Sequence, residues 1–170
     1  MPRLDTSPVA VVARIGRAAA LIDRGLNENF KRFGLNRTSW DALAALRRVG
    51  APYRRSPTEL YRSLMRTSGG MTHLVDRLER DGLVERIADQ DDRRGLLVGL
   101  TRSGRALVTR VGPSHLETER RMLGALTKRE QAELARLLRK LLIGLEQQFP
   151  ELTPPAPAET RRSRRHRRPH

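Results

Sequence analysis

The segment from Thr67 to Thr101 constrains the fold more than any other part of the chain. Its first half repeats apolar residues at i, i+3, i+4 and i+7, the spacing of a helix that is buried on one side. These residues are Met71, Leu74, Val75 and Leu78. Gly82 follows and predicts a left-handed end to the helix. Two short apolar runs, 83–87 and 96–100, then flank an Asp- and Arg-rich link. A helix with a polar outer face followed directly by a basic β-hairpin predicts a winged helix-turn-helix, with DNA as its partner.

A second helix precedes this segment and meets it across a tight turn. The sequence SPTE at 56–59 is a capping box with proline at the first helical position, which is a strong signal for the start of a helix. Thr67 or Ser68 is expected to cap the next helix. Two helices at this spacing predict a helix-turn-helix.

Both ends of the predicted folded part carry long apolar stripes. Between Pro8 and Phe33, apolar residues repeat at three- and four-residue steps. Near the other end, Thr101 is expected to cap a helix that Pro113 kinks, and the capping box TKRE at 127–130 opens a leucine-dense helix. A stripe this long predicts either a long core helix or a helix that packs against a partner subunit. The second interpretation predicts a twofold dimer, which would place two reading helices about 34 Å apart, one turn of DNA.

These elements together predict a mainly α fold, a winged helix-turn-helix with about six helices and a two- or three-stranded β-wing. Residues 35–100 are expected to form the DNA-binding lobe, while residues 8–34 and 101–149 form a helical dimerisation lobe. Residues 1–7 and the Pro- and Arg-rich tail, 150–170, are expected to be disordered because they cannot bury enough apolar surface.

The charge of the chain favours a polyanionic partner. It holds 34 Lys and Arg against 19 Asp and Glu, a net charge of +15, and binding that neutralises phosphates releases counterions. The aromatic content of 4% argues against stacking platforms for single-stranded nucleic acid. In the tail, residues 161–168 contain six arginines, which would either contact phosphates without regard to sequence or remain solvated.

Several other classes of function are excluded by what the sequence lacks. There is no cysteine, which removes disulfides, thiol catalysis and most zinc sites. No apolar run approaches the roughly 20 residues of a membrane span, and the N-terminus has no apolar signal core, so a cytoplasmic protein is expected. No Ser/His/Asp group, metal-ligand set or phosphate-binding loop appears. We therefore expect no enzyme, no cofactor and no metal.

The run from Ser56 to Thr101 resembles MarR-type transcriptional regulators. PTELYRSLMRTSGGMTHLVDRLERDGLVER is similar to the two helices of the family's motif, and DQDDRRGLLVGLT is similar to its wing. The order of helices matches along residues 8–149. The resemblance implies a homodimer that binds palindromic operator DNA in bacteria, as a repressor or an activator, and we expect a repressor.

The resemblance also implies release from DNA by a small aromatic or phenolic compound. Oxidant sensing through thiols is excluded by the absence of cysteine, and a metal response is weakly supported because the folded part has only His73 and His115. Trp40 begins a helix that Thr38 is expected to cap, close to where family ligands bind between the lobes. It is a candidate wall of such a pocket, with a core position as the alternative. The first helix contains no tryptophan, so urate, which some relatives bind through one, is not supported.

The candidate DNA contacts lie on the predicted reading helix, on the helix before it and on the wing. The start of a reading helix normally approaches base edges, while arginines on its flanks contact phosphates. The candidates on the two helices are Ser56, Arg66, Thr67, Ser68, Gly69, Gly70, Thr72, His73 and Arg77, with Arg80 as a further phosphate contact. The two glycines would allow close approach to DNA or merely relax the helix start, and the histidine could make no contact at all.

Arg93 and Arg94 are the candidates on the wing. In the family, one arginine of this pair enters a minor groove, where narrow A·T-rich stretches attract arginine, and the other braces the wing. Arg94 is our choice for the groove, and Asp92 and Asp76 are the expected partners of the bracing arginine. A solvated charge cluster is the alternative.

Two other functions remain open at this stage. A winged helix is also used for non-specific DNA binding, or for protein or RNA contact. Arginines at both the reading helix and the wing favour DNA.

Overall fold

The computed structural model describes residues 5–64, 69–89 and 95–150. In this part of the chain, six helices and a three-stranded sheet confirm the predicted fold class. The helices are α1 (Ser7–Lys31), α2 (Arg37–Arg48), α3 (Pro57–Ser63), α4 (Gly69–Arg80), α5 (Arg102–Met122) and α6 (Lys128–Gln148). The strands are β1 (Arg54–Arg55), β2 (Val84–Ala88) and β3 (Leu96–Leu100).

Most of the predicted helix starts are confirmed. Ser56 and Thr127 each form a complete capping box, and Thr101 caps α5 by accepting a hydrogen bond from the backbone N–H of Gly104 at 3.0 Å. The prediction for α2 was wrong. Its cap is Asn36, whose side-chain Oδ1 accepts a hydrogen bond from the backbone N–H of Ser39 at 2.8 Å. Both Asn and Thr cap helices well, so this choice depends on where the preceding turn delivers the chain.

Two glycines lie in the left-handed conformation just beyond a helix, and Gly82 does so as predicted. Gly34 has φ +71° after α1, and Gly82 has φ +68° after α4. These left-handed conformations are open to glycine at no steric cost. Helix α5, by contrast, continues through Pro113 to Met122 as one helix.

The wing contains three antiparallel strands in the order β1-β3-β2. Val84 pairs with Leu100 at the base of the hairpin, and Arg54 pairs with Gly99 on the other side of the central strand. Strand β1 comes directly before the capping box of α3. A two-residue strand carries no periodic signal of its own, so its pairing with β3 defines it.

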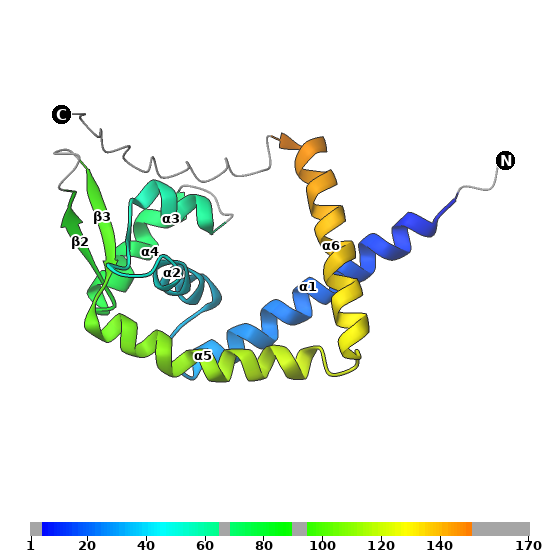
Figure 1. Cartoon of the computed structure of the whole chain (residues 1–170), viewed down its shortest axis with the longest axis horizontal. Helices are drawn as coiled ribbons and strands as arrows, with labels where there is room; N and C mark the ends of the chain where they lie inside the picture. Colours follow the sequence, from blue (N-terminus) through cyan, green and yellow to red (C-terminus); the bar gives the residue numbers. More distant parts are fainter. Residues whose placement is uncertain (1–4, 65–68, 90–94, 151–170) are drawn as a thin grey trace, which may run out of the picture.

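The core lies where the DNA-binding lobe meets the helical lobe. Leu43 and Leu46 of α2 are fully buried there with Phe30 of α1 and Val111 of α5. Both predicted lobes therefore contribute to one core at their junction. In Figure 1, α2, α3, α4 and the sheet gather at one end of the molecule, while α1 and α5 extend away from them.

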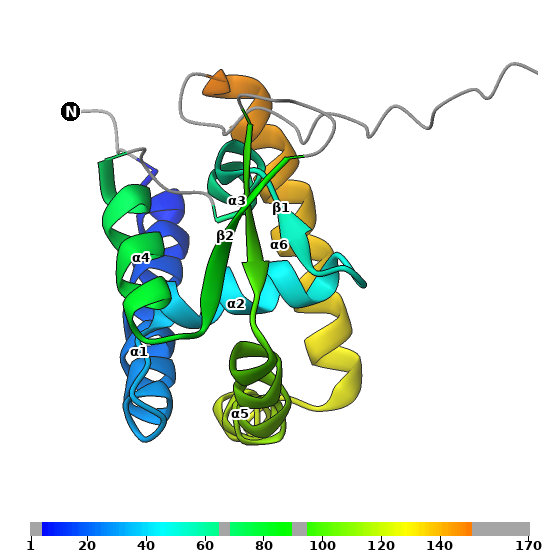
Figure 2. The ribbon, with the colours of Figure 1, turned by 90° about the vertical axis from the view of Figure 1, so that its left-hand side faces the viewer.

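The N-terminal part of α1 and the whole of α6 lie outside this core. Figure 2 shows the two helices on opposite sides of α5, so their overlap in Figure 1 is a matter of view. Helix α6 has no buried residue. Within the described residues, no helix combines the length and the apolar character that crossing a membrane requires.

Candidate nucleic-acid interface

Helix α4 presents two different faces. Leu74, Val75 and Leu78 are buried against the core, as the apolar spacing predicted. Thr72 and His73 are exposed on the outer face, near the start of the helix. A donor and acceptor hydroxyl and an imidazole at this position can reach base edges when the helix enters a major groove.

Apart from Arg77 and Arg80, the remaining predicted DNA contacts divide into two groups. Gly69 and Gly70 begin α4, and Ser56 caps α3, where its hydroxyl accepts a hydrogen bond from the backbone N–H of Glu59 at 3.2 Å. The others lie outside the described residues. They are Arg66, Thr67, Ser68, Arg93, Arg94 and the arginines of the tail.

Arg77 makes a contact with the protein that the sequence did not predict. Its guanidinium donates a hydrogen bond to the hydroxyl of Ser39, which is fully buried in α2. The two residues are 38 positions apart, so no local pattern indicates the contact. This bond ties the middle of the reading helix to the helix behind it. A phosphate contact by Arg77 remains a prediction.

Arg86 of β2 is a second residue that the sequence reasoning missed. Its guanidinium forms ion pairs with Asp76 and with Glu79, both on α4. The backbone N–H of Arg86 also donates a hydrogen bond to Oε1 of Glu79 at 3.2 Å. The hydrogen bond to Asp76 raises the pKa of Arg86 above its ordinary value, against a partial desolvation that lowers it.

Asp76 was expected to pair with an arginine of the wing tip. Among the described residues its partner is Arg86, on the strand nearest α4. The available signal was the pair of acids at i and i+3 on α4, which a cation on a neighbouring element can pair.

A backbone hydrogen bond joins the two strands of the hairpin just before the loop that connects them. The backbone N–H of Asp89 donates to the carbonyl of Gly95 at 3.0 Å. The five residues between them include both wing arginines, and their positions are outside the described part of the chain.

Trp40 lies in the core. Only 6% of the residue is exposed, and its ring stacks on Phe30 with centroids 5.4 Å apart. The ring of His115 meets it edge-on at 5.1 Å. These contacts join α1, α2 and α5 at the junction of the two lobes. A ligand contact by Trp40 remains a prediction.

A cleft opens beside this junction, between α1, α2 and α3. Its volume is about 470 Å³, and it is lined by Ala19, Asp23, Arg37, Asp41, Arg48, Ser63 and Leu64. The Nε of Arg37 lies 3.0 Å from Oδ2 of Asp41, and an Nη lies 3.7 Å from Oδ1 of Asp23. No group of three or more His, Asp or Glu side chains in the described residues could hold a metal ion.

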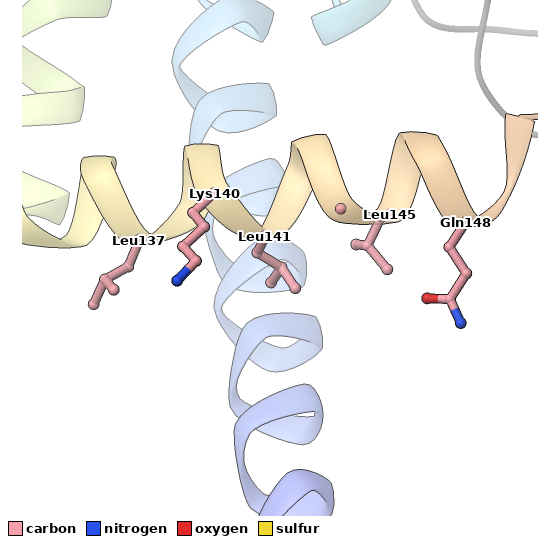
Figure 3. Close-up of a pocket in the computed structure, with 6 residues that line it drawn as sticks. Leu137, Lys140, Leu141, Leu145 and Gln148 are labelled. Carbon is pink, nitrogen blue, oxygen red and sulfur yellow. The ribbon is translucent and has the colours of Figure 1, made fainter.

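The long helices expose much apolar surface. On α1 the exposed residues include Val9, Val11, Val12, Ile15, Leu21 and Ile22, and on α6 they include Leu134, Leu137, Leu138, Leu141, Leu142, Ile143 and Leu145. On α6, a groove of about 410 Å³ runs along one side of the helix. Figure 3 shows Leu137, Leu141 and Leu145 projecting into it in a row.

Comparison with known proteins gives a consistent result. The model of the MarR family matches residues 33–95. The HTH-type transcriptional regulator PecS of Dickeya dadantii is 39% identical over 137 residues, which cover 81% of this chain and 82% of PecS.

Two solved structures of regulators bound to DNA are also similar. Sco3205, a MarR family transcriptional regulator from Streptomyces coelicolor in complex with DNA, is 29% identical, with a TM-score of 0.76 over 86% of this chain and 92% of its own. A mutant MarR from E. coli, in complex with operator DNA, is 28% identical, with a TM-score of 0.73 over 82% and 98% of the two chains.

Proposed function

Because the chain belongs to the MarR family of transcriptional regulators, whose members are not enzymes, we propose that it binds palindromic duplex DNA sequence-specifically as a homodimer. It acts in the cytoplasm as a repressor, since a dimer seated on an operator can block access to a promoter. A small molecule releases it.

The arrangement of α4 is the observation that carries this proposal. The helix is anchored on its inner side by Leu74, Val75 and Leu78, and its exposed outer side carries Thr72 and His73. The hairpin of β2 and β3 stands beside it, with β2 in contact with α4. A helix for the major groove and a wing for the adjacent backbone or minor groove are the two contacts of a winged helix with DNA.

Dimerisation is supported by the unpaired apolar faces of α1 and α6. A helix of 21 residues with no buried residue cannot owe its stability to packing within one chain. A second copy can cover these faces around a twofold axis, and the groove on α6 (Figure 3) offers it a row of leucines with a gap at Gly144.

The cleft between the lobes is the proposed effector site. Leu64 and Ala19 supply apolar surface, while Arg48 can pair with an anionic group on a phenolic or aromatic ligand. Because the cleft touches both α1 and α3, a ligand wedged into it would change the position of the DNA-binding lobe relative to the dimer.

The proposal is tested by selecting duplexes from a random library with the full chain. We expect a short palindrome bound by one dimer, with affinity that falls steeply with salt. Equal, salt-sensitive binding to every duplex would instead support a non-specific module, and failure to bind duplex DNA would favour a protein or RNA partner.

Ligand release is tested with 4-hydroxybenzoate as a phenolic probe. It should lower the affinity of the wild type for the selected duplex, and this response should weaken in Arg48→Gln. A response that is the same in both proteins would place the effector elsewhere.

A further inference from the structure

The reading helix lies along the free edge of the wing. Strand β2 is at the edge of the sheet, with β3 on its other side. The carboxylate of Glu79 accepts the backbone N–H of Arg86 at 3.2 Å, at the edge where a further strand would otherwise pair. The Glu79 side chain thus accepts the hydrogen bond that a neighbouring strand would accept at this edge.

The side chain of Arg86 extends the same connection along α4. It forms ion pairs with Asp76 and Glu79, which lie about one helical turn apart. A guanidinium has several donors in a fixed planar fork, so it can hold two carboxylates in a defined geometry. One residue of the wing therefore holds two residues on successive turns of the reading helix.

The covalent link between the two elements is short. Residues 81–83 alone join α4 to β2, and Gly82 is in the left-handed conformation. The backbone N–H of Leu83 donates to the carbonyl of Leu78 at 2.9 Å, and the hydroxyl of Thr101 donates to the carbonyl of Gly82 at 2.7 Å, so the link itself is held. The contacts of Arg86 add a second connection farther from the link, on both the helix and the strand.

Arg86 also compensates charge on a surface that faces phosphates in the proposed function. Asp76 and Glu79 are partly exposed, with 42% and 39% of their side chains accessible. Without a cation beside them, both carboxylates would repel the DNA backbone.

We infer that Arg86 is a positioning residue for DNA recognition. Through Asp76 and Glu79 it holds the reading helix and the wing at the angle at which both can contact one duplex. The inference rests on the proposed function, and it assigns Arg86 no direct contact with DNA.

The test is a double-mutant cycle on operator binding. The variants are Arg86→Gln, the pair Asp76→Asn with Glu79→Gln, and the combination of all three. The probes are the duplex selected by the wild type and a scrambled duplex of the same length, each titrated at two or more salt concentrations.

We expect Arg86→Gln to weaken binding of the selected duplex about tenfold more than binding of the scrambled duplex. Repulsion from the two uncompensated carboxylates acts on both duplexes, whereas a positioning residue acts on specificity. The slope of affinity against salt should stay the same, because no phosphate contact is lost. In the background without the two carboxylates, the same substitution should have almost no further effect.

Arg80→Gln serves as the matched control. Arg80 is exposed in the last turn of α4 and forms no ion pair with the rest of the described chain. Because Arg80 is a predicted phosphate contact, its loss should weaken both duplexes alike and leave the preference for the selected duplex intact. Thermal melting of each variant shows whether it is folded at the temperature of the binding assay.

Two results would overturn the inference while leaving the proposed function in place. One is an equal loss of binding from Arg86→Gln in both backgrounds, with the salt slope lowered by about one, which would mean a direct phosphate contact. The other is an unchanged preference for the selected duplex. A wild type that selects no sequence would refute the proposed function itself, and this inference with it.

Discussion

Replacing Leu141 with alanine is expected to weaken the proposed dimer by an amount that the structure allows us to estimate. Leu141 projects from α6 into the groove shown in Figure 3, and 41% of the residue is exposed in one chain. In a dimer that covers the groove, this exposed part becomes buried.

The size of the effect follows from the area that remains to be buried. Full burial of a leucine is worth about 1.5–3 kcal/mol, so the remaining 41% is worth about 0.6–1.2 kcal/mol. A twofold interface contains the residue twice, which gives about 1.2–2.4 kcal/mol for the dimer. Because a tenfold change corresponds to about 1.4 kcal/mol, the dimer dissociation constant should rise by about 7- to 50-fold.

Sedimentation velocity over a dilution series measures this constant directly. Leu96→Ala is the matched control, since Leu96 is 51% exposed but lies in β3 of the wing. Its loss should leave the dimer constant unchanged. The reasoning is refuted if Leu141→Ala has no effect on the dimer, if both variants have the same effect, or if the wild type is a monomer at micromolar concentration.

Three further predictions concern the folded state and its dependence on pH. Arg77→Ala should lower the free energy of unfolding by about 1–3 kcal/mol, because it leaves the buried hydroxyl of Ser39 unpaired; urea unfolding measures this. Gly104→Ala should lower the melting temperature by several degrees, since a Cβ there would lie 2.0 Å from the carbonyl oxygen of Leu83. Glu130→Gln should reduce the loss of stability on acidification, because hydrogen bonds from the Thr127 hydroxyl and backbone N–H lower the pKa of Glu130. The ionised carboxylate therefore stabilises the fold above its unfolded pKa, and this stabilisation disappears as the pH falls through the lower folded pKa. Melting temperatures from pH 7 to pH 3 measure the difference.

Each of these predictions has a control at an exposed residue. Arg80→Ala removes an exposed arginine of α4 and should leave the unfolding free energy unchanged. Ser103→Ala alters an exposed neighbour in α5 and should leave the melting temperature within about 1 °C. Glu117→Gln should keep the acid sensitivity of the wild type. A Gly104 variant as stable as the wild type would mean that α5 can move away from Leu83 without loss.

Local signals in the sequence were sufficient for most helix boundaries. The capping boxes at 56–59 and 127–130 and the glycine at 82 act through bonds to residues within a few positions, so they can be read from the chain alone. The choice between Asn36 and Thr38 as the cap of α2 was missed because both residues are suitable.

Contacts between distant residues could not be read in this way. Strand β1 exists through its pairing with Gly99 and Val98, which lie more than 40 positions further along the chain. Arg77 meets Ser39 because α4 packs across α2, and Arg86 faces Asp76 because β2 turns back along α4.

The sequence alone determined the class of fold and the position of the helix that we propose for DNA contact. Its apolar spacing, caps and left-handed glycines act locally, and the motif between Ser56 and Thr101 is long enough to identify the family. The tertiary structure decided which arginines hold the reading helix and which apolar faces remain without a partner inside one chain. Both depend on how helices and strands cross in space, and that geometry is set by packing of the shared core at the junction of the two lobes.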